Sequence, residues 1–496
     1  MPGYRFRKIG VICLLCTVFA LFNSPVFARS AEELQQQARL LQQNGQHEKA
    51  VQAFSDLIKL QPDNAELYFY RANSYGVLQA FDQALQDYSA AIARDSQDER
   101  FYGSRGLLYV RQQQYQPAIA DFSAAIKLNP LPMLYFLRGT AYDSIKEYDS
   151  AIADYTMLVK LQPNSFLAYG ARGKAYAAAG RTIQAIADYS KVIELRPDFP
   201  AGYVMRAEAY AGGGRLDSAI ADYTTAITLD LDNYAFYVER GKLYQASGRN
   251  DFAIVDYSKA IDLNANYAAA YRNRGAAYAA AGQEELSQTD LAKAAGLEQK
   301  AAVHRHLLRG MMLELNKQHD LAVAEYTKAI ELEPQKPEHY LLRANAYDDG
   351  KEQRELALAD YEKAIALGPD NAASYYERSV WYYRSGQYDL ALQDANHALS
   401  LTPGYAQAFN ARGNIYAVQG KYAEAVLEFE KAIELDPKDK SALFNLGQTY
   451  ELLKNKKAAT AYYQKAAAAG GRIGEEAEVK LKARNQGDWK SAREWL

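Results

Sequence analysis

Two kinds of reactive side chain recur at a fixed distance along this chain of 496 residues. An arginine returns eleven times, about 34 residues apart, and an acidic residue follows each one sixteen or seventeen positions later. A row of free guanidinium groups could bind an anionic glycan or an acidic protein tail, whereas arginines paired with carboxylates would hold the structure together. The arginines are Arg71, Arg105, Arg138, Arg172, Arg206, Arg240, Arg274, Arg309, Arg343, Arg378 and Arg412, and the acids are Asp87, Asp121, Asp154, Asp188, Asp222, Asp256, Asp290, Glu325, Asp360, Asp394 and Glu428.

The arginines and the acids disappear together at both ends of the row. The first repeat has Gln37 and Ala53 at the two positions, and the last repeat has Leu446 and Tyr462. Pairing between neighbouring repeats would leave an unmatched residue at each end, whereas pairing within a repeat leaves none. We therefore expect each arginine to form a bidentate ion pair with the acid of its own repeat.

The residue types that catalysis needs are scattered. The closest pair of histidines, His304 and His306, is two residues apart, so on a helix the two rings point to different faces and do not easily share a metal ion. No glycine-rich phosphate loop follows a strand pattern. We expect a protein that is not an enzyme and binds neither a metal nor a cofactor.

The elements that position the arginines repeat thirteen times. If each repeat is numbered from 1 to 34, a small residue stands at position 8, alanine at position 20, and proline at position 32 in many copies. Tyrosine prevails at positions 4, 11 and 24, which accounts for most of the 40 tyrosines. Positions 4, 8 and 11 share one face of a first helix (helix A), and positions 20, 24 and 27 share one face of a second (helix B), which the proline ends.

This frame resembles the tetratricopeptide repeat, whose signature has an aromatic residue at 4, Gly at 8, Tyr at 11, Ala at 20, an aromatic residue at 24 and Pro at 32. The resemblance implies an all-α, right-handed superhelical solenoid of about thirteen helix-turn-helix repeats. We expect the array over residues 29–473. Its eighth repeat, about residues 268–301, is irregular and is either a flexural point or a packing variant. Residues 474–496 are expected as a capping helix or as a docking tail that uses Trp489 and Trp495.

The resemblance also implies that helix A lines a concave groove for extended or helical segments of partner proteins, with positions 2, 5, 9 and 12 facing it. The middle of the chain has mostly small residues there, such as Ala201, Ala235 and Ala269. The alternative is that these are only helix-favouring choices. The candidate binding residues are Lys174, Glu208, Lys242, Gln245, Arg272, Asn345, Tyr376, Tyr383, Asn410 and Asn414.

Residues 1–28 have the pattern of a secretory signal peptide. Arg5, Arg7 and Lys8 precede a short apolar run, and small residues in Val26-Phe27-Ala28 suit cleavage before Arg29. An uncleaved anchor is the alternative. The chain's two cysteines, Cys13 and Cys16, lie in this segment. We therefore expect an exported protein, periplasmic or extracellular, with no membrane span after cleavage.

The net charge and the repeat architecture limit the range of possible functions. Loss of the three basic residues of the signal segment changes the formal net charge from −3 to −6, which argues against nucleic acid or an anionic membrane as the main partner. We expect an exported scaffold that binds protein segments. The alternatives are an accessory subunit of a secretion or polysaccharide-export machine in the cell envelope, and a secreted effector that acts on another cell. The sequence does not indicate an oligomeric state.

Overall fold

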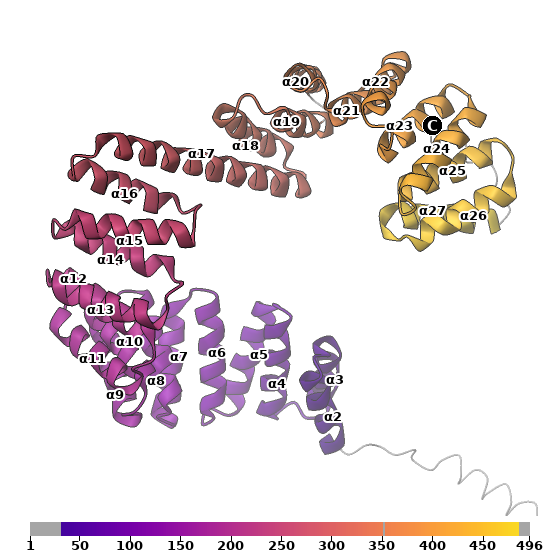
Figure 1. Ribbon diagram of the computed structural model, residues 1–496. Helices are drawn as coiled ribbons and strands as arrows, with labels where there is room; N and C mark the ends of the chain where they lie inside the picture. Colours follow the sequence, from indigo (N-terminus) through magenta and orange to yellow (C-terminus); the bar gives the residue numbers. More distant parts are fainter. Residues whose placement is uncertain (1–30, 351–352, 486–496) are drawn as a thin grey trace, which may run out of the picture. The chain divides into compact units, whose positions relative to one another are not determined.

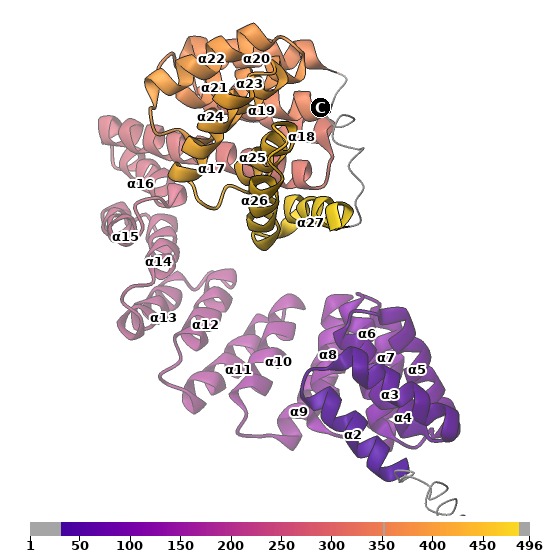
Figure 2. The ribbon, with the colours of Figure 1, turned by 90° about the vertical axis from the view of Figure 1, so that its right-hand side faces the viewer.

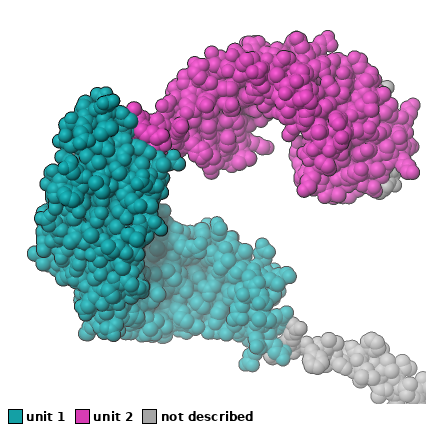
Figure 3. All heavy atoms as spheres, in the orientation of Figure 1, with its two compact units in different colours: residues 1–290 teal, residues 291–496 magenta. Residues whose placement is uncertain are grey.

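The computed structural model describes residues 31–350 and 353–485. Over these residues it contains 26 helices and no strand, so the predicted class is confirmed: the chain is an all-α superhelical solenoid of helix-turn-helix repeats. The expected signal peptide lies outside the described residues, as do Trp489 and Trp495. The chain divides into two compact units, which we call unit 1 (residues 1–290) and unit 2 (residues 291–496; Figure 3).

Successive helix pairs lie side by side within unit 1 (Figure 1). The A helices are α2 (Ala31–Gln43), α4 (Ala65–Val77), α6 (Glu99–Arg111), α8 (Pro132–Ser144), α10 (Phe166–Ala178), α12 (Pro200–Gly212), α14 (Tyr234–Ala246) and α16 (Ala268–Ala280). The B helices are α3 (His47–Leu60), α5 (Phe81–Arg94), α7 (Tyr115–Leu128), α9 (Tyr148–Leu161), α11 (Thr182–Leu195), α13 (Leu216–Leu229) and α15 (Asn250–Leu263).

Unit 2 continues the same alternation. Its B helices are α18 (His319–Leu332), α20 (Arg354–Leu367), α22 (Tyr388–Leu401), α24 (Tyr422–Leu435) and α26 (Lys456–Ala468). Its A helices after the first are α19 (Pro337–Asp349), α21 (Ala372–Arg384), α23 (Ala406–Val418) and α25 (Lys440–Leu452). A last helix, α27 (Gly471–Asn485), packs on α26 and α25 (Figure 2) and buries Ala477 completely. It therefore covers the apolar face of the last repeat, as a capping helix does, and it begins three residues before the expected boundary at residue 474.

The irregular eighth repeat lacks a turn at its end. One helix, α17 (Glu284–Leu315), supplies helix B of the eighth repeat and helix A of the ninth, and the boundary between the two compact units falls within it. The sequence explains the missing turn, since no proline and no Asn or Asp interrupts Glu298-Gln299-Lys300-Ala301, the positions at which the other repeats break. The structure gives this repeat a fused helix. The two interpretations drawn from the sequence, a flexural point and a packing variant, both stay predictions.

The two helices of a repeat approach closely because position 8 has a very small side chain. In seven repeats a Cβ added to the glycine at this position would lie only 2.5–2.9 Å from the aromatic ring at position 24. Gly173, for example, faces the ring of Tyr189, which is almost fully buried. The ring therefore fills the space that a larger side chain on helix A would need, and the alanine at position 20 lies at zero exposure beside it.

Ten of the eleven expected arginine–acid pairs come together within their own repeats. Each of these guanidinium groups donates from Nε and Nη2 to both oxygens of the carboxylate, at 2.6–2.9 Å. The arginine side chains are 15–21% exposed and the acids 5–16%. These groups are thus engaged by each other and are not a row of free cations for an anionic ligand.

The same arginines also bond to the preceding repeat, which the sequence analysis did not foresee. In nine of the ten, Nη1 donates to a side-chain oxygen at position 25 of the repeat before, at 2.8–3.4 Å. The acceptor is a serine or threonine hydroxyl in eight cases and Asn396 in the ninth. Arg378 is the exception, because the preceding repeat has Glu362 at that position. One buried guanidinium therefore joins three helices, and we call this arrangement the arginine clamp.

Repeat 9 departs from the expectation. Arg309 lies 3.8 Å from Glu325 and its side chain is 70% exposed, so this pair is not the buried bidentate contact that the sequence predicted. His306 Nδ1 at 2.7 Å and Lys328 Nζ at 2.9 Å contact the Glu325 carboxylate instead. Repeat 8 has Ala292 at position 25 and offers no hydroxyl for Arg309, but Arg378 keeps its bidentate pair without one. What sets repeat 9 apart is that its helix A is part of the fused helix α17 and that His306 stands at position 4 in place of tyrosine.

We predict that Arg172→Ala lowers the free energy of unfolding by about 3–5 kcal/mol, because it leaves the buried carboxylate of Asp188 without its partner. Chemical denaturation of the full chain followed by circular dichroism measures the change. Arg309→Ala is the matched control and should cost less than about 1 kcal/mol, since its guanidinium is mostly in solvent. Equal losses of unfolding free energy for Arg172→Ala and Arg309→Ala would contradict the clamp.

A double-mutant cycle of Arg172→Ala with Asp188→Ala gives a second test. If the two single losses simply add in the double variant, the pairing is contradicted.

Candidate functional site

The tyrosine rings at position 24 pack against helix A, and several of their hydroxyls reach side chains on the groove side of that helix. The rings are buried, and several of their hydroxyls donate to a side chain at position 9 or 12 of helix A. Tyr155 donates to Asp143 at 2.9 Å, Tyr257 to Gln245 at 3.1 Å, and Tyr361 to Asn345 at 2.6 Å. Burial raises the pKa of these hydroxyls, so they remain protonated donors at neutral pH. In these three repeats the buried tyrosine thus orients a groove residue of helix A.

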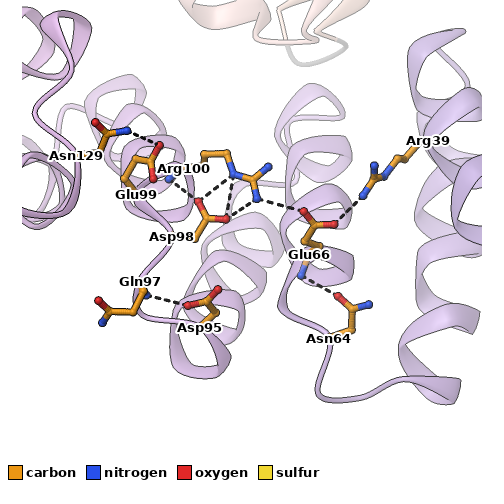
Figure 4. Close-up of polar contacts among 9 residues, drawn as sticks. All are labelled: Arg39, Asn64, Glu66, Asp95, Gln97, Asp98, Glu99, Arg100 and Asn129. Atoms are coloured by element: carbon orange, nitrogen blue, oxygen red, sulfur yellow. Dashed lines mark hydrogen bonds and ion pairs between the residues drawn. The ribbon is translucent and has the colours of Figure 1, made fainter. Parts of the chain in front are cut away.

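At the N-terminal edge of unit 1, polar side chains on adjacent A helices satisfy one another (Figure 4). Glu66 on α4 accepts from Arg39 on α2 at 2.7 Å and from Arg100 on α6 at 3.2 Å. Asp98 caps α6 by accepting from the backbone N–H of Arg100 at 2.9 Å, and it also binds the Arg100 guanidinium. Burial acts to raise the pKa of Asp98, but the hydrogen bonds from Arg100 outweigh it and the pKa is lowered.

The remaining groups of this edge are helix caps and one contact between repeats. Asn64 caps α4 by accepting from the N–H of Glu66, Asp95 accepts from the N–H of Gln97, and Asn129 donates to Glu99 at 3.1 Å (Figure 4). Charges that already pair with a neighbour make poor anchors for a partner, because binding must break the existing contacts. We therefore look for binding groups further along each unit.

Five of the ten candidate binding residues lie on α10 to α16 of unit 1. Lys242 donates to Glu239 at 2.7 Å, and Gln245 accepts from Tyr257. Arg272 and Lys174 lie exposed on α16 and α10. Glu208 is exposed on α12, although burial, with a smaller contribution from the charge of Glu239, raises the pKa of its carboxyl. The structure does not gather these five side chains into one pocket.

The other five lie in unit 2, and four of them line a single pocket. Tyr376 and Tyr383 come from α21, and Asn410 and Asn414 come from α23. Helices α25 and α27 close the pocket, whose volume is about 390 Å³. Asn345, on α19, is not among the lining residues and accepts from Tyr361. We call this cavity the amide pocket.

The amide pocket has an apolar floor and a rim of neutral hydrogen-bonding groups. Val380 and Phe444 contribute apolar surface, and Gln407 and Asn445 add two more amides. Asn445 donates to Asn410 at 3.1 Å, which orients the pair. Arg384, also at the rim, is held by Asp348 at 2.5 Å. Primary amides both donate and accept, so a row of them matches the alternating N–H and C=O groups of an extended peptide backbone.

Sequence reasoning missed some groove residues that the structure brings forward. Met133 and Leu167, both at position 2, are 63% and 65% exposed, and Phe136 at position 5 is 37% exposed. Asp143 at position 12 has a buried carboxylate oxygen, Oδ1, with no hydrogen-bond partner among the described residues. Reading positions 2, 5, 9 and 12 in every repeat, and not only in the alanine-rich middle, would have identified all four.

Across residues 31–350 and 353–485, no three histidine, cysteine or acidic side chains converge in a way that could hold a metal ion. Within the same ranges, no helix combines the length and the apolar character needed to cross a membrane.

Comparison with known proteins gives the following likenesses. Among solved structures, MamA is 27% identical over 33% of this chain and 96% of its own, with a TM-score of 0.32. YrrB, described as a TPR protein with an unusual peptide-binding site, is 22% identical over 38% of this chain and 96% of its own, with a TM-score of 0.34. The C-terminal part of a TPR repeat-containing protein from Cytophaga hutchinsonii is 18% identical over 48% and 98%, with a TM-score of 0.44. No curated protein matches the chain significantly.

Family models account for the repeats themselves. The model described as tetratricopeptide repeat matches residues 36–99, 104–166, 171–235 and 341–406. Two related models match residues 246–282 and 413–454, and residues 303–336 and 441–469. The matches follow one another along most of the chain and agree with the observed helix pairs. This protein therefore belongs to the tetratricopeptide repeat family.

Proposed function

We propose that this protein is an interaction scaffold that binds extended peptide segments of partner proteins on the groove side of its A helices, with the amide pocket of unit 2 as the main site. The observation that carries the proposal is the set of neutral amides on α23 and α25 above an apolar floor. Asn414 and Gln407 make no hydrogen bond among the described residues, so their donors and acceptors are available. Binding then needs little rearrangement of existing contacts.

The character of the pocket favours a peptide over a charged small molecule. Its charged rim residues already have partners, since Arg384 pairs with Asp348 and Arg472 with Glu476 at 2.8 Å. Tyr376 and Tyr383 offer ring faces beside the amides. A peptide backbone can use the amides, and its side chains can pack on the rings and on the apolar floor. The bound segment is therefore neutral or nearly neutral where it crosses the pocket.

We predict that peptides selected on the full chain from a display library bind at least about 10-fold more weakly to the Asn410→Ala, Asn414→Ala double variant, because two backbone-binding amides are lost. Isothermal titration calorimetry measures the affinity. Gln464→Ala is the matched control, since this amide is exposed on the B helix α26 and should not alter binding. If the groove variant and Gln464→Ala bind alike, or if no peptide is selected, the proposal is wrong.

The location of the scaffold is a second part of the proposal. Its support is the sequence of residues 1–28, where basic residues, a short apolar run and a small-residue cleavage pattern follow one another. An exported chain that loses this segment also loses Cys13 and Cys16 and would have no thiol, which suits an oxidising compartment.

We predict that the chain recovered from its native cells begins at Arg29. Mass spectrometry of the intact protein and of its N-terminal peptide after cell fractionation measures this, and periplasmic or released fractions should contain it. A replacement of Ala28 by a bulky residue, Ala28→Leu, should slow processing, because cleavage needs a small residue there. A chain that still begins at Met1 in the cell interior would exclude export by this route.

A further inference from the structure

A second pocket, in unit 1, combines an orphaned acidic oxygen with aromatic walls. It lies among α8, α9 and α10, and its volume is about 440 Å³. Phe136, Tyr148 and Tyr155 contribute aromatic surface, Asp143 contributes the carboxylate, and Lys174 lies at the rim. The amide pocket has no comparable acidic group without a partner. We call this cavity the acidic pocket.

The two oxygens of Asp143 differ in their surroundings. Oδ2 accepts a hydrogen bond from Tyr155 at 2.9 Å. Oδ1 is buried and has no partner among the described residues. Burial accordingly raises the pKa of the Asp143 carboxyl, and the hydrogen bond from Tyr155 offsets only part of that rise. A buried acceptor without a donor costs free energy. A turn of the carboxylate toward a donor supplied by a bound group would recover that cost.

The walls of the acidic pocket favour a cationic donor. The ring of Phe136 is 37% exposed, and it lines the pocket together with Tyr148 and the Asp143 carboxylate. Aromatic faces attract ammonium and guanidinium groups, and the carboxylate adds a charge-assisted hydrogen bond. The volume is large enough for a lysine or arginine side chain.

We propose that the acidic pocket binds a lysine or arginine side chain of a partner protein segment, with the Asp143 carboxylate accepting its N–H and Phe136 and Tyr148 flanking its cation. The inference rests on the proposed function in that the ligand is a protein segment, but it concerns a different unit and adds a charge requirement that the amide pocket does not have. Asp143 is thereby a specificity-determining residue.

The exposed apolar residues near this pocket set the spacing of the ligand. Met133 and Asp143 are ten residues apart on α8, which is about 15 Å along the helix axis. An extended segment that runs along α8 covers this distance in four or five residues. The partner segment should therefore have an apolar residue four or five positions from the basic one, to cover Met133 or its neighbour Leu167, which are both largely exposed.

Substitution of Lys174 should change the affinity for a basic side chain in the direction opposite to substitution of Asp143. The side chain of Lys174 is exposed and forms no ion pair with Asp143 within 4 Å in the described structure, so it does not fill the place of the ligand. Its charge is nevertheless close enough to favour the ionised form of Asp143. A second cation in the pocket is repelled by Lys174, and removal of that charge should strengthen binding of a basic side chain while removal of Asp143 weakens it.

The test uses the full chain and a peptide display library. Peptides that are enriched on the wild-type chain and depleted on Asp143→Asn should share a lysine or arginine four or five positions from an apolar residue. A synthetic peptide of that group is then compared with its citrulline or acetyl-lysine form by calorimetry. We expect about a 10-fold loss of affinity when either the Asp143 charge or the charge of the peptide side chain is removed, and no further loss when both are removed. Lys174→Met should increase the affinity a few-fold.

The control is Asp82→Asn, an exposed residue on the B helix α5, which changes the net charge equally and should leave binding unchanged. Enriched peptides without a basic residue, or a charged and a neutral peptide that bind alike, would overturn the inference and leave the amide pocket untouched. Failure to enrich any peptide on the wild-type chain would overturn both this inference and the proposed function. Near-ultraviolet circular dichroism of Asp143→Asn shows whether Tyr155 keeps its surroundings.

Discussion

A single buried guanidinium, repeated ten times, is the contact on which the rest of the structure depends. It binds the acid of its own helix B through two hydrogen bonds and, in nine repeats, the position-25 side chain of the preceding helix B through a third. A buried ion pair is stabilising only when its hydrogen bonds are satisfied, and here the geometry satisfies them. The consequence is a fixed spacing between neighbouring helix pairs within each unit, to which the tyrosine rings and the position-8 glycines are fitted.

Repeat 9 is the one described repeat in which the expected arginine–acid pair does not form. Position 4 is His306 in place of the usual tyrosine, and position 25 of the preceding repeat is Ala292. His306 and Lys328 contact Glu325, and Arg309 lies mostly in solvent. The missing hydroxyl alone does not explain this, because Arg378 also lacks one and keeps its bidentate pair. The backbone differs at the same place, because α17 continues without a turn. The arginine clamp and the turn between the two helices are thus absent at the same place. We therefore regard the clamp as the contact that determines how neighbouring repeats stack.

The clamp also separates stability from recognition. Because the repeating arginines are engaged, binding must use the side chains that do not repeat, at positions 2, 5, 9 and 12. The position-24 tyrosine supports these from below, as Tyr155 does for Asp143. One pocket offers neutral amides and the other an acid among aromatic rings, so the two units would select segments of different chemistry.

The sequence predicted the repeat frame, the helix pairs and the arginine–acid pairing, because these recur and vanish together and so can be read without an alignment. The third hydrogen bond was missed, since a helical serine such as Ser190 has no evident partner until the preceding repeat is placed beside it. Tyr376, Tyr383, Asn410 and Asn414 were named from the sequence as separate groove residues, but the pocket that they line with α25 and α27 depends on tertiary packing. Asp143 could have been found from its place at position 12, but the orphaned state of its Oδ1 could not, because that is a property of burial and not of residue type.

The most direct test of the clamp is hydrogen exchange of the Arg206→Ala chain, followed by mass spectrometry with peptide resolution. Arg206 bonds Asp222 on α13 and Ser190 on α11, in two different repeats. Our account predicts faster exchange in both α11 and α13, with α5, which lies several repeats away, unchanged. Faster exchange in α13 alone would show that the arginine stabilises only its own repeat, and would contradict the claim that it fixes the stacking of neighbours.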